Sequence, residues 1–291
     1  MSLRTLALAD FDLPAAPQRI DELGASLPGV DRARIHAPAG RFLLICSTGP
    51  LGLAFEATLF DLLAEAHYPA PRPRRAKGGS FVAPLKGPAG TAAAACYVWP
   101  PGDEGEAGAA SVPRLLEVGR LLARLHQLGE AHPASVSDPA EPAALLPHVA
   151  AGPEKDTLAE ALGQRLPSLP TGAVHGGFAP LMMLFAGDRA SAVLPTGRSC
   201  AAGLLLDLCA AATQWAEGAA KPVPILRALF SGYQALRRLS PEELEAVPLM
   251  LRHAAAREGL RRAALHLGEP LAPLRTLDGL ADEDLRAAAG G

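Results

Sequence analysis

A short polar break divides this chain into two halves whose hydrophobic residues recur with different periods. The break runs from Pro100 to Glu106 and reads Pro-Pro-Gly-Asp-Glu-Gly-Glu. Segments of this composition usually connect compact units. Short apolar runs bounded by turns predict strands before the break, whereas helical spacing dominates after it. We therefore expect an α+β protein of two lobes, with a β-rich N-lobe over residues 1–99, a hinge over 100–110 and a helical C-lobe over 111–291.

The N-lobe is expected to combine strands with one amphipathic helix. Residues 1–29 predict a helix-containing leader, because apolar residues recur there at helical spacing and Pro28-Gly29 ends the segment. Residues 30–48 predict a hairpin whose second strand, Phe42 to Cys46, is apolar throughout and therefore buried. The apolar residues of the leader are Leu13, Ile20, Leu23 and Leu27. The other expected elements are a helix at 54–66 and strands near 80–83 and 92–98.

The C-lobe is expected to be mostly helical around a small hairpin. Ser111 is a predicted cap of its first helix, and Ser240 with Glu243 predicts a capping box at the start of the last long helix. The turn Gly187-Asp188 is expected to join two short strands. Strands are predicted at 173–174, 182–185 and 191–194, and further helices at 154–165, 203–217, 223–237 and 241–266.

Composition narrows the possible functions. The net charge is -3, from 27 basic and 30 acidic residues, so the chain has no general basic field for nucleic acid or anionic lipid. No uninterrupted apolar stretch approaches the roughly 18 residues of a membrane span. The cysteines lack C-x-x-C spacing and lie among apolar residues, which predicts buried free thiols and a cytoplasmic location. They are Cys46, Cys96, Cys200 and Cys209.

Taken in order, a series of short segments resembles the homoserine kinase type II branch of the aminoglycoside phosphotransferase and choline kinase superfamily. The resemblance extends from about residue 20 to about residue 275, and it depends on the order and spacing of the segments. It implies a two-lobe protein-kinase-like fold. The segments include Gly40 to Leu44, Leu59 to Pro73, Val98 to Gly102, Gly119 to His126, Gly172 to His175, Leu184 to Arg189, Leu206 to Leu208 and Ser231 to Leu236.

The same resemblance points to positions where chemistry is missing. In this superfamily a His-x-Asp motif is followed five residues later by Asn, and a second Asp comes after the next hairpin. The first Asp positions the nucleophile, while the Asn and the second Asp hold Mg²⁺. This chain has Gly177, Met182 and Pro195 at those three positions. None offers a carboxylate or an amide, and a thioether is a poor ligand for a hard cation.

The nucleotide-facing lobe is depleted in the same way. The basic residue that many relatives carry on the strand from Phe42 to Cys46 would fall near Ile45, which cannot pair with phosphate. We therefore expect no cofactor, with ATP and Mg²⁺ binding weak or absent. The sequence predicts a catalytically inactive pseudokinase that binds a partner protein or a small metabolite in the cleft between the lobes.

Other polar residues of the resembling segments are expected to be structural. His175 and His126 match packing residues of the family, and Asp207 matches an aspartate that braces the catalytic loop. One alternative is an active phosphotransferase that recruits Asp188 or Asp207 in place of the missing acids, although Asp188 is also a favoured turn residue. A second alternative is a structural partner subunit, which would expose an apolar patch of several hundred Å².

Overall fold

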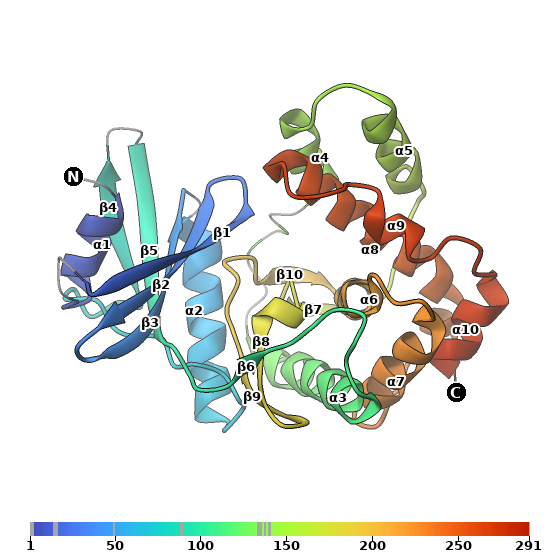
Figure 1. Ribbon diagram of the computed structural model, residues 1–291, viewed down its shortest axis with the longest axis horizontal. Coiled ribbons are helices and arrows are strands. Elements are labelled where there is room, and N and C mark those ends of the chain that lie inside the picture. The colour runs from blue at the N-terminus through green and yellow to red at the C-terminus, as the bar shows by residue number, and fades with distance from the viewer. Residues whose placement is uncertain are drawn as a thin grey trace.

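The N-terminal part of the chain is an antiparallel sheet of five strands in the order β1-β2-β3-β5-β4 (Figure 1). The computed structural model describes residues 3–13, 17–48, 50–87, 90–132, 136, 138 and 141–290. The strands are β1 (Arg19–Leu27), β2 (Val30–Ala37), β3 (Gly40–Ser47), β4 (Val82–Gly87) and β5 (Gly90–Val98). The expected hairpin at 30–48 and the two later strands are confirmed.

Strand β1 corrects the prediction for residues 1–29. Among the described residues of this segment, α1 (Leu3–Asp10) is the helical part, whereas residues 19–27 pair antiparallel with β2. Leu27 lies opposite Val30, so Pro28-Gly29 is the turn of a hairpin, and Gly29 has the positive φ of +78° that such a turn requires. The helical spacing of the four apolar residues was therefore misleading.

Two helices cover opposite faces of this sheet, which explains why β3 and β5 carry apolar residues on both faces. Leu43 and Ile45 of β3 pack with α2 (Pro50–Glu65), while Phe42 and Leu44 pack on the other face with residues of α1. Successive side chains of a strand point to opposite faces, so a strand covered on both sides needs apolar residues at every position. Figure 1 shows α1 and α2 on the two sides of the sheet.

The C-terminal part is a helical body whose two closest helices meet through glycine. A Cβ at Gly119 of α3 would lie 2.1 Å from the carbonyl oxygen of Leu229, and one at Gly232 of α7 would lie 2.2 Å from that of Leu116. The backbones therefore touch at this crossing. The long helices are α3 (Val112–Gly129), α6 (Leu204–Ala216), α7 (Pro222–Gln234) and α8 (Pro241–Leu265), and the shorter ones are α4 (Pro142–Leu145), α5 (Pro153–Leu162), α9 (Ala272–Arg275) and α10 (Asp282–Gly290).

The predicted caps are present. The Ser111 hydroxyl accepts a hydrogen bond from the Arg114 N–H at the start of α3, and Ser240 and Glu243 form the capping box of α8. The expected helices at 154–165, 223–237 and 241–266 are confirmed within a few residues at each end.

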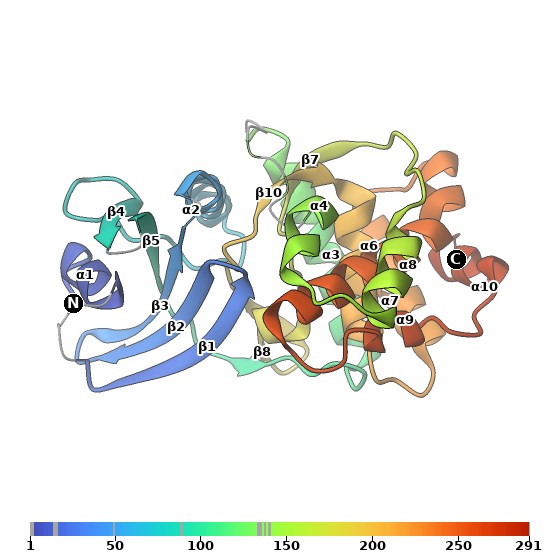
Figure 2. The same cartoon turned by 90° about the horizontal axis from the view of Figure 1, so that it is seen from above.

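Two small sheets lie between the large sheet and the helical body (Figure 2). One joins β6 (Asp103–Glu104), β8 (Met183–Ala186) and β9 (Arg189–Val193), and the other pairs β7 (Thr171–Val174) with β10 (Cys200–Gly203). Strand β6 shows that the polar break is partly ordered by pairing with β8. Strand β10 was not predicted, because Cys-Ala-Ala-Gly has no β-branched residue and takes its extended form from β7.

The whole chain is therefore the mixed α+β arrangement that was predicted, with an N-terminal antiparallel sheet and a helical C-terminal region. The lobe boundaries at 99 and 111 stay predictions. Within the described ranges, no helix is long and apolar enough to cross a membrane. The four cysteines are free thiols; three are buried and Cys46 is half-buried.

Candidate functional site

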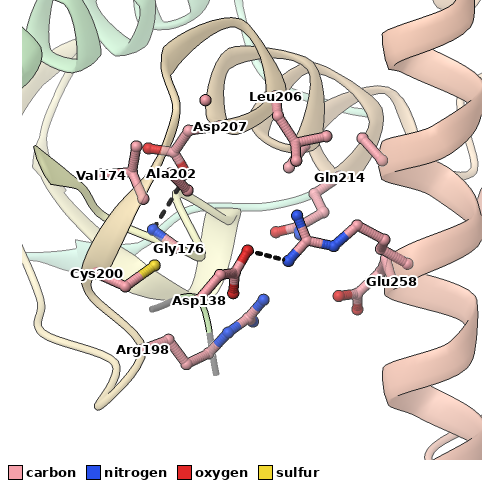
Figure 3. Close-up of a pocket in the computed structure, with 14 residues that line it drawn as sticks. Asp138, Val174, Gly176, Arg198, Cys200, Ala202, Leu206, Asp207, Gln214 and Glu258 are labelled. Atoms are coloured by element: carbon pink, nitrogen blue, oxygen red, sulfur yellow. Dashed lines mark hydrogen bonds and ion pairs between the residues drawn. The ribbon is translucent and has the colours of Figure 1, made fainter. Parts of the chain in front are cut away.

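The loop after β7 is held from behind by one buried carboxylate. Asp207 lies in the first turn of α6, and its Oδ2 accepts the N–H of His175 at 3.0 Å while its Oδ1 accepts the N–H of Gly176 at 3.1 Å. Both oxygens are therefore occupied by the backbone of the loop that they support. Figure 3 shows the hydrogen bond to Gly176.

A chain of buried side chains supports Asp207 in turn. The Tyr233 hydroxyl lies 2.7 Å from Nδ1 of His126, and Nε2 of His126 lies 3.2 Å from Oδ2 of Asp207. A carboxylate can only accept, so Nε2 of His126 carries the hydrogen and the tyrosine donates to Nδ1. Burial raises the pKa of Asp207, but the hydrogen bonds from His126 and from the His175 backbone lower that pKa below the usual value.

His175 is a packing residue in this loop. Its Nε2 donates to the carbonyl oxygen of Leu194 at 2.9 Å, and its ring meets the Phe178 ring edge-on at a centroid distance of 5.2 Å. Its Nδ1 is buried and has no hydrogen-bond partner among the residues that the structure describes. Burial lowers the pKa of His175, so the neutral ring persists and ties the loop to the segment after β9.

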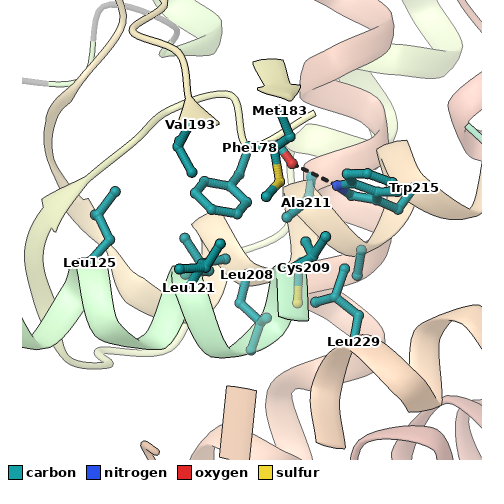
Figure 4. Packing of buried hydrophobic residues seen from close by; sticks show 14 of the residues in the cluster. Leu121, Leu125, Phe178, Met183, Val193, Leu208, Cys209, Ala211, Trp215 and Leu229 are labelled. Atoms are coloured by element: carbon teal, nitrogen blue, oxygen red, sulfur yellow. Dashed lines mark hydrogen bonds between the residues drawn. The ribbon is translucent and has the colours of Figure 1, made fainter. Parts of the chain in front are cut away.

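The middle of the loop is anchored in the helical body. Phe178 is fully buried, and its carbonyl oxygen accepts a 2.9 Å hydrogen bond from Nε1 of Trp215 (Figure 4). Met183 is also fully buried in this cluster. The side chains of Phe178 and Met183 therefore point into the core. The neighbouring Met182 instead lines the cleft between the lobes.

The three positions singled out by the sequence come together between the lobes. Gly177 and Met182 line a cleft of about 460 Å³, and Met182 and Pro195 line an adjoining pocket of about 80 Å³. A Cβ at Gly177 would lie 3.1 Å from Nη1 of Arg198. A guanidinium therefore lies beside the position where the family resemblance implies a carboxylate.

The segment after β9 wraps around a glutamate that the sequence reasoning missed. Glu56 of α2 is fully buried, and its carboxylate accepts the N–H of Gly197 at 2.8 Å and that of Thr196 at 3.1 Å. The hydroxyl of Ser199 donates to it at 2.9 Å. Every hydrogen bond that Glu56 accepts within the described part of the chain comes from residues 196–199.

Ile45 lies beside the segment that binds this glutamate. Ile45 is fully buried on β3, and a Cβ at Gly197 would lie 3.2 Å from its side chain. The loop therefore packs on an apolar residue at the position where many relatives carry a basic residue. An acidic residue inside the apolar run of α2, between Phe55 and Ala57, was the available sequence signal for Glu56.

Arginines dominate the charge of the larger cleft, and these too were missed. Arg32 of β2, Arg198, and Arg261 and Arg262 of α8 all line it. Arg261 pairs with Glu258. Burial alone would raise the pKa of Glu258, but the hydrogen bond from Arg261 outweighs burial and lowers that pKa to about 2. The sequence did not indicate these four arginines as a group, because they come from three distant segments of the chain.

The smaller pocket lies against the hinge and is mostly apolar. Its lining includes Leu23 of β1, Leu43 of β3 and Trp99, the residue that precedes the polar break. Arg34 stacks over the Trp99 ring at 4.7 Å from its centroid. The volume of about 80 Å³ leaves room for only a few atoms.

The two acids proposed as substitutes are both engaged elsewhere. Asp188 lies in the turn between β8 and β9, where its Oδ1 accepts a 2.7 Å hydrogen bond from Ser111, and Asp207 is fully occupied as described above. Across the residues that the structure describes, no group of three or more His, Cys, Asp or Glu side chains is arranged to hold a metal ion.

Comparison with known proteins agrees with the fold and with the resemblance. A sequence model described as the phosphotransferase enzyme family, APH, matches residues 29–242. A homoserine kinase from Caulobacter sp. (strain K31) is 29% identical over 280 residues, which cover 88% of this chain and 84% of that protein. A homoserine kinase from Rhizobium meliloti (strain 1021) is 33% identical over 162 residues, covering 50% of this chain and 49% of that protein.

Solved structures show the same fold at low sequence identity. An amicoumacin kinase, hAmiN, in complex with AMP-PNP, Ca²⁺ and Ami superimposes with a TM-score of 0.67 at 14% identity, covering 94% of this chain and 87% of that chain. A microcompartment-associated aminopropanol kinase superimposes with a TM-score of 0.67 at 13% identity, covering 99% and 93%. The two-lobe kinase-like fold predicted from the sequence is confirmed.

Proposed function

This chain belongs to the phosphotransferase enzyme family, and from that premise we propose that it is a pseudokinase, which binds a ligand between its lobes and transfers no phosphate. The observation that carries the proposal is the meeting of Gly177, Met182 and Pro195 around one inter-lobe region beside the Arg198 guanidinium. The cleft of about 460 Å³ favours a small metabolite as the ligand, and a partner protein is the alternative occupant.

The residues present do not fit the Mg²⁺ and ATP that the family implies. Magnesium takes oxygen ligands in octahedral geometry, and carboxylates usually supply the protein's share. Gly177 and Pro195 have no polar side-chain atom, and the Met182 sulfur is 2.8 Å from Nη1 of Arg32. Losing one transition-state contact typically slows an enzyme by ~10²–10³-fold. The loss of three such groups argues for no useful phosphoryl transfer.

The framework around the missing groups supports a folded, ligand-binding role. Asp207, His126 and Tyr233 form a continuous buried network, and we propose that Asp207 braces the loop without entering any reaction. The pocket at the hinge is small and Ile45 cannot pair with phosphate, so we propose that any nucleotide binding is weak. The free thiols fit a reducing compartment, and we propose a cytoplasmic location.

The test is a search for turnover. Purified protein is incubated with ATP and Mg²⁺, with homoserine, a choline-like amine or an aminoglycoside as acceptor, and ATP consumption is measured. We expect a rate equal to that without acceptor and unchanged in Arg198→Gln. Turnover above background that disappears in Arg198→Gln but persists in Arg227→Gln, an exposed arginine of α7, would overturn the proposal.

A further inference from the structure

Two arginines that line the inter-lobe cleft have no carboxylate partner among the described residues. The guanidinium of Arg198 takes part in no hydrogen bond or ion pair there, and its Nε is buried without a partner. Within the described part of the chain, the Arg32 side chain donates hydrogen bonds only to the Met182 sulfur and, at 3.4 Å, to the Leu23 carbonyl oxygen, and its Nε is also buried without a partner. A partly buried guanidinium with unused donors is costly unless something satisfies it.

The acids that line the same cleft are already engaged. Glu258 accepts hydrogen bonds from Arg261 and Arg262, and Glu217 accepts two from Arg262. Glu106 is the remaining acid of the lining, and it lies exposed in the segment after β6. Within the described residues, Arg32 and Arg198 therefore line the cleft without a hydrogen bond or ion pair to any of these acids, although the charge of Glu258 acts on Arg198 from a distance.

The electrostatic consequence appears on both side chains. Burial lowers the pKa of Arg198 to about 10, and the nearby charge of Arg261 lowers it as well, while the charges of Glu258 and Asp138 partly oppose this. The pKa of Arg32 is lowered to about 10 by the same two causes. Arg261 thus repels both Arg32 and Arg198, and a negative ligand between them would relieve that repulsion.

We infer that the cleft binds a small phosphorylated molecule, a phosphate monoester, through Arg32 and Arg198, with the charge of the Glu258-paired Arg261 nearby and without a metal ion. The inference deepens the proposed function, on which it rests, by naming the ligand class. Arginines arrive from β2, from the segment after β9 and from α8, which are three separate directions. A tetrahedral phosphate presents oxygens toward all three, whereas a carboxylate presents two oxygens in one plane.

The remaining volume defines the rest of the ligand. About 460 Å³ exceeds the size of inorganic phosphate alone, and the wall formed by Ala179, Pro180 and Leu181 is apolar. A compact organic group attached to the phosphate would fit against this wall. The site thereby replaces a family arrangement of acids that hold a cation with a set of cations that hold an anion.

The experiment measures binding by calorimetry and thermal shift, without added metal, at constant ionic strength set with chloride. The probes are inorganic phosphate, glycerol 3-phosphate and succinate. We expect saturable binding of both phosphates, tighter for the ester, and no saturable binding of succinate. Arg198→Gln and Arg32→Gln are each expected to weaken phosphate binding at least tenfold, whereas the matched charge change Arg227→Gln leaves it unaltered.

Each other outcome counts against the inference. Failure of both phosphates to bind the wild-type protein, or equal binding of succinate, overturns it even if either variant is too unstable to purify. Phosphate binding that only an adventitious surface site explains would survive both cleft variants. These results are separable from the turnover assay, because absent phosphate binding with absent turnover refutes this inference and leaves the pseudokinase proposal standing.

Discussion

The loop between β7 and β8 has two faces with opposite chemistry. Its rear face rests on α6, where Asp207 accepts two backbone hydrogen bonds and is itself linked to His126 and Tyr233. Its front face meets the inter-lobe cleft with Gly177 and Met182, and arginines surround them. The groups that hold this loop are separate from the residues that face the cleft, so on our proposal the loop keeps its form with Gly177 and Met182 in place of reactive groups.

The largest expected effect comes from breaking the rear face. Asp207→Ala would leave His126 and two loop N–H groups without an acceptor in a buried site, so we expect the free energy of unfolding to fall by about 3–5 kcal/mol. Urea denaturation measures the change. Asp188→Ala, at the exposed turn between β8 and β9, is the control and should cost ~1 kcal/mol or less. A loss below ~1 kcal/mol for Asp207→Ala would contradict the brace.

The next effect concerns the anchor of the segment after β9. Glu56→Gln keeps the shape of the side chain but removes the charge that strengthens its hydrogen bonds to residues 196–199, so we expect a loss of about 1.5–3 kcal/mol. Glu65→Gln, exposed near the end of the same helix, should change stability by less than ~0.5 kcal/mol. Equal effects of the two changes would show that the segment does not depend on Glu56.

A third prediction sharpens the comparison at the front face. Gly177→Asp puts a carboxylate beside Nη1 of Arg198. The tip of the arginine side chain can shift to make room for the new carboxylate and pair with it. We expect at least tenfold weaker phosphate binding and no Mg²⁺-dependent turnover, because the positions of the metal ligands still hold Met182 and Pro195. Gly177→Asn is the uncharged control and should retain more of the phosphate affinity. Recovered turnover in Gly177→Asp would show that the loop has been aligned wrongly with the family.

The smallest expected effect is a pH dependence of the rear face. The pKa of His175 is lowered by burial in the folded protein, so the unfolded chain takes up its proton first as the pH falls below about 6.5. The contribution of His175 to the free energy of unfolding is therefore fully present above that pH. It declines below that pH by at most about 1.4 kcal/mol per pH unit. His253, whose pKa burial lowers to about 4, adds to the same slope.

Denaturation of His175→Gln between pH 7.5 and 5 checks this prediction. The variant should lose stability less steeply than the wild-type protein across that range, while the exposed His148→Gln should keep the wild-type slope. Identical slopes in all three proteins would mean that His175 titrates normally in its buried position.

Local patterns predicted most of the fold but could not predict pairing across long distances. The capping box at Ser240 and the apolar strand at Phe42 to Cys46 are local features, and both are present. Strand β1 was predicted as helix because its apolar spacing suits either form, and only its pairing with β2 decides. Strand β10 is likewise extended because β7 lies beside it.

The same distinction applies to the site. Spacing within one loop placed Gly177 and Met182 together, and the structure puts both at the cleft. Glu56 and its segment are 140 or more residues apart in the chain, and Arg32 is 150 residues from the methionine that it contacts. Such contacts arise from tertiary packing, so no periodicity or motif in a single sequence predicts them.

The most direct test of the central claim is an ATP titration followed by thermal shift, with magnesium and with a chelator. The account predicts weak stabilisation by ATP that Mg²⁺ does not increase, because Glu217 and Glu258 of the cleft lining are paired with arginines and Gly177, Met182 and Pro195 carry no carboxylate for the cation. A tenfold or greater gain in ATP affinity when Mg²⁺ is present would contradict it.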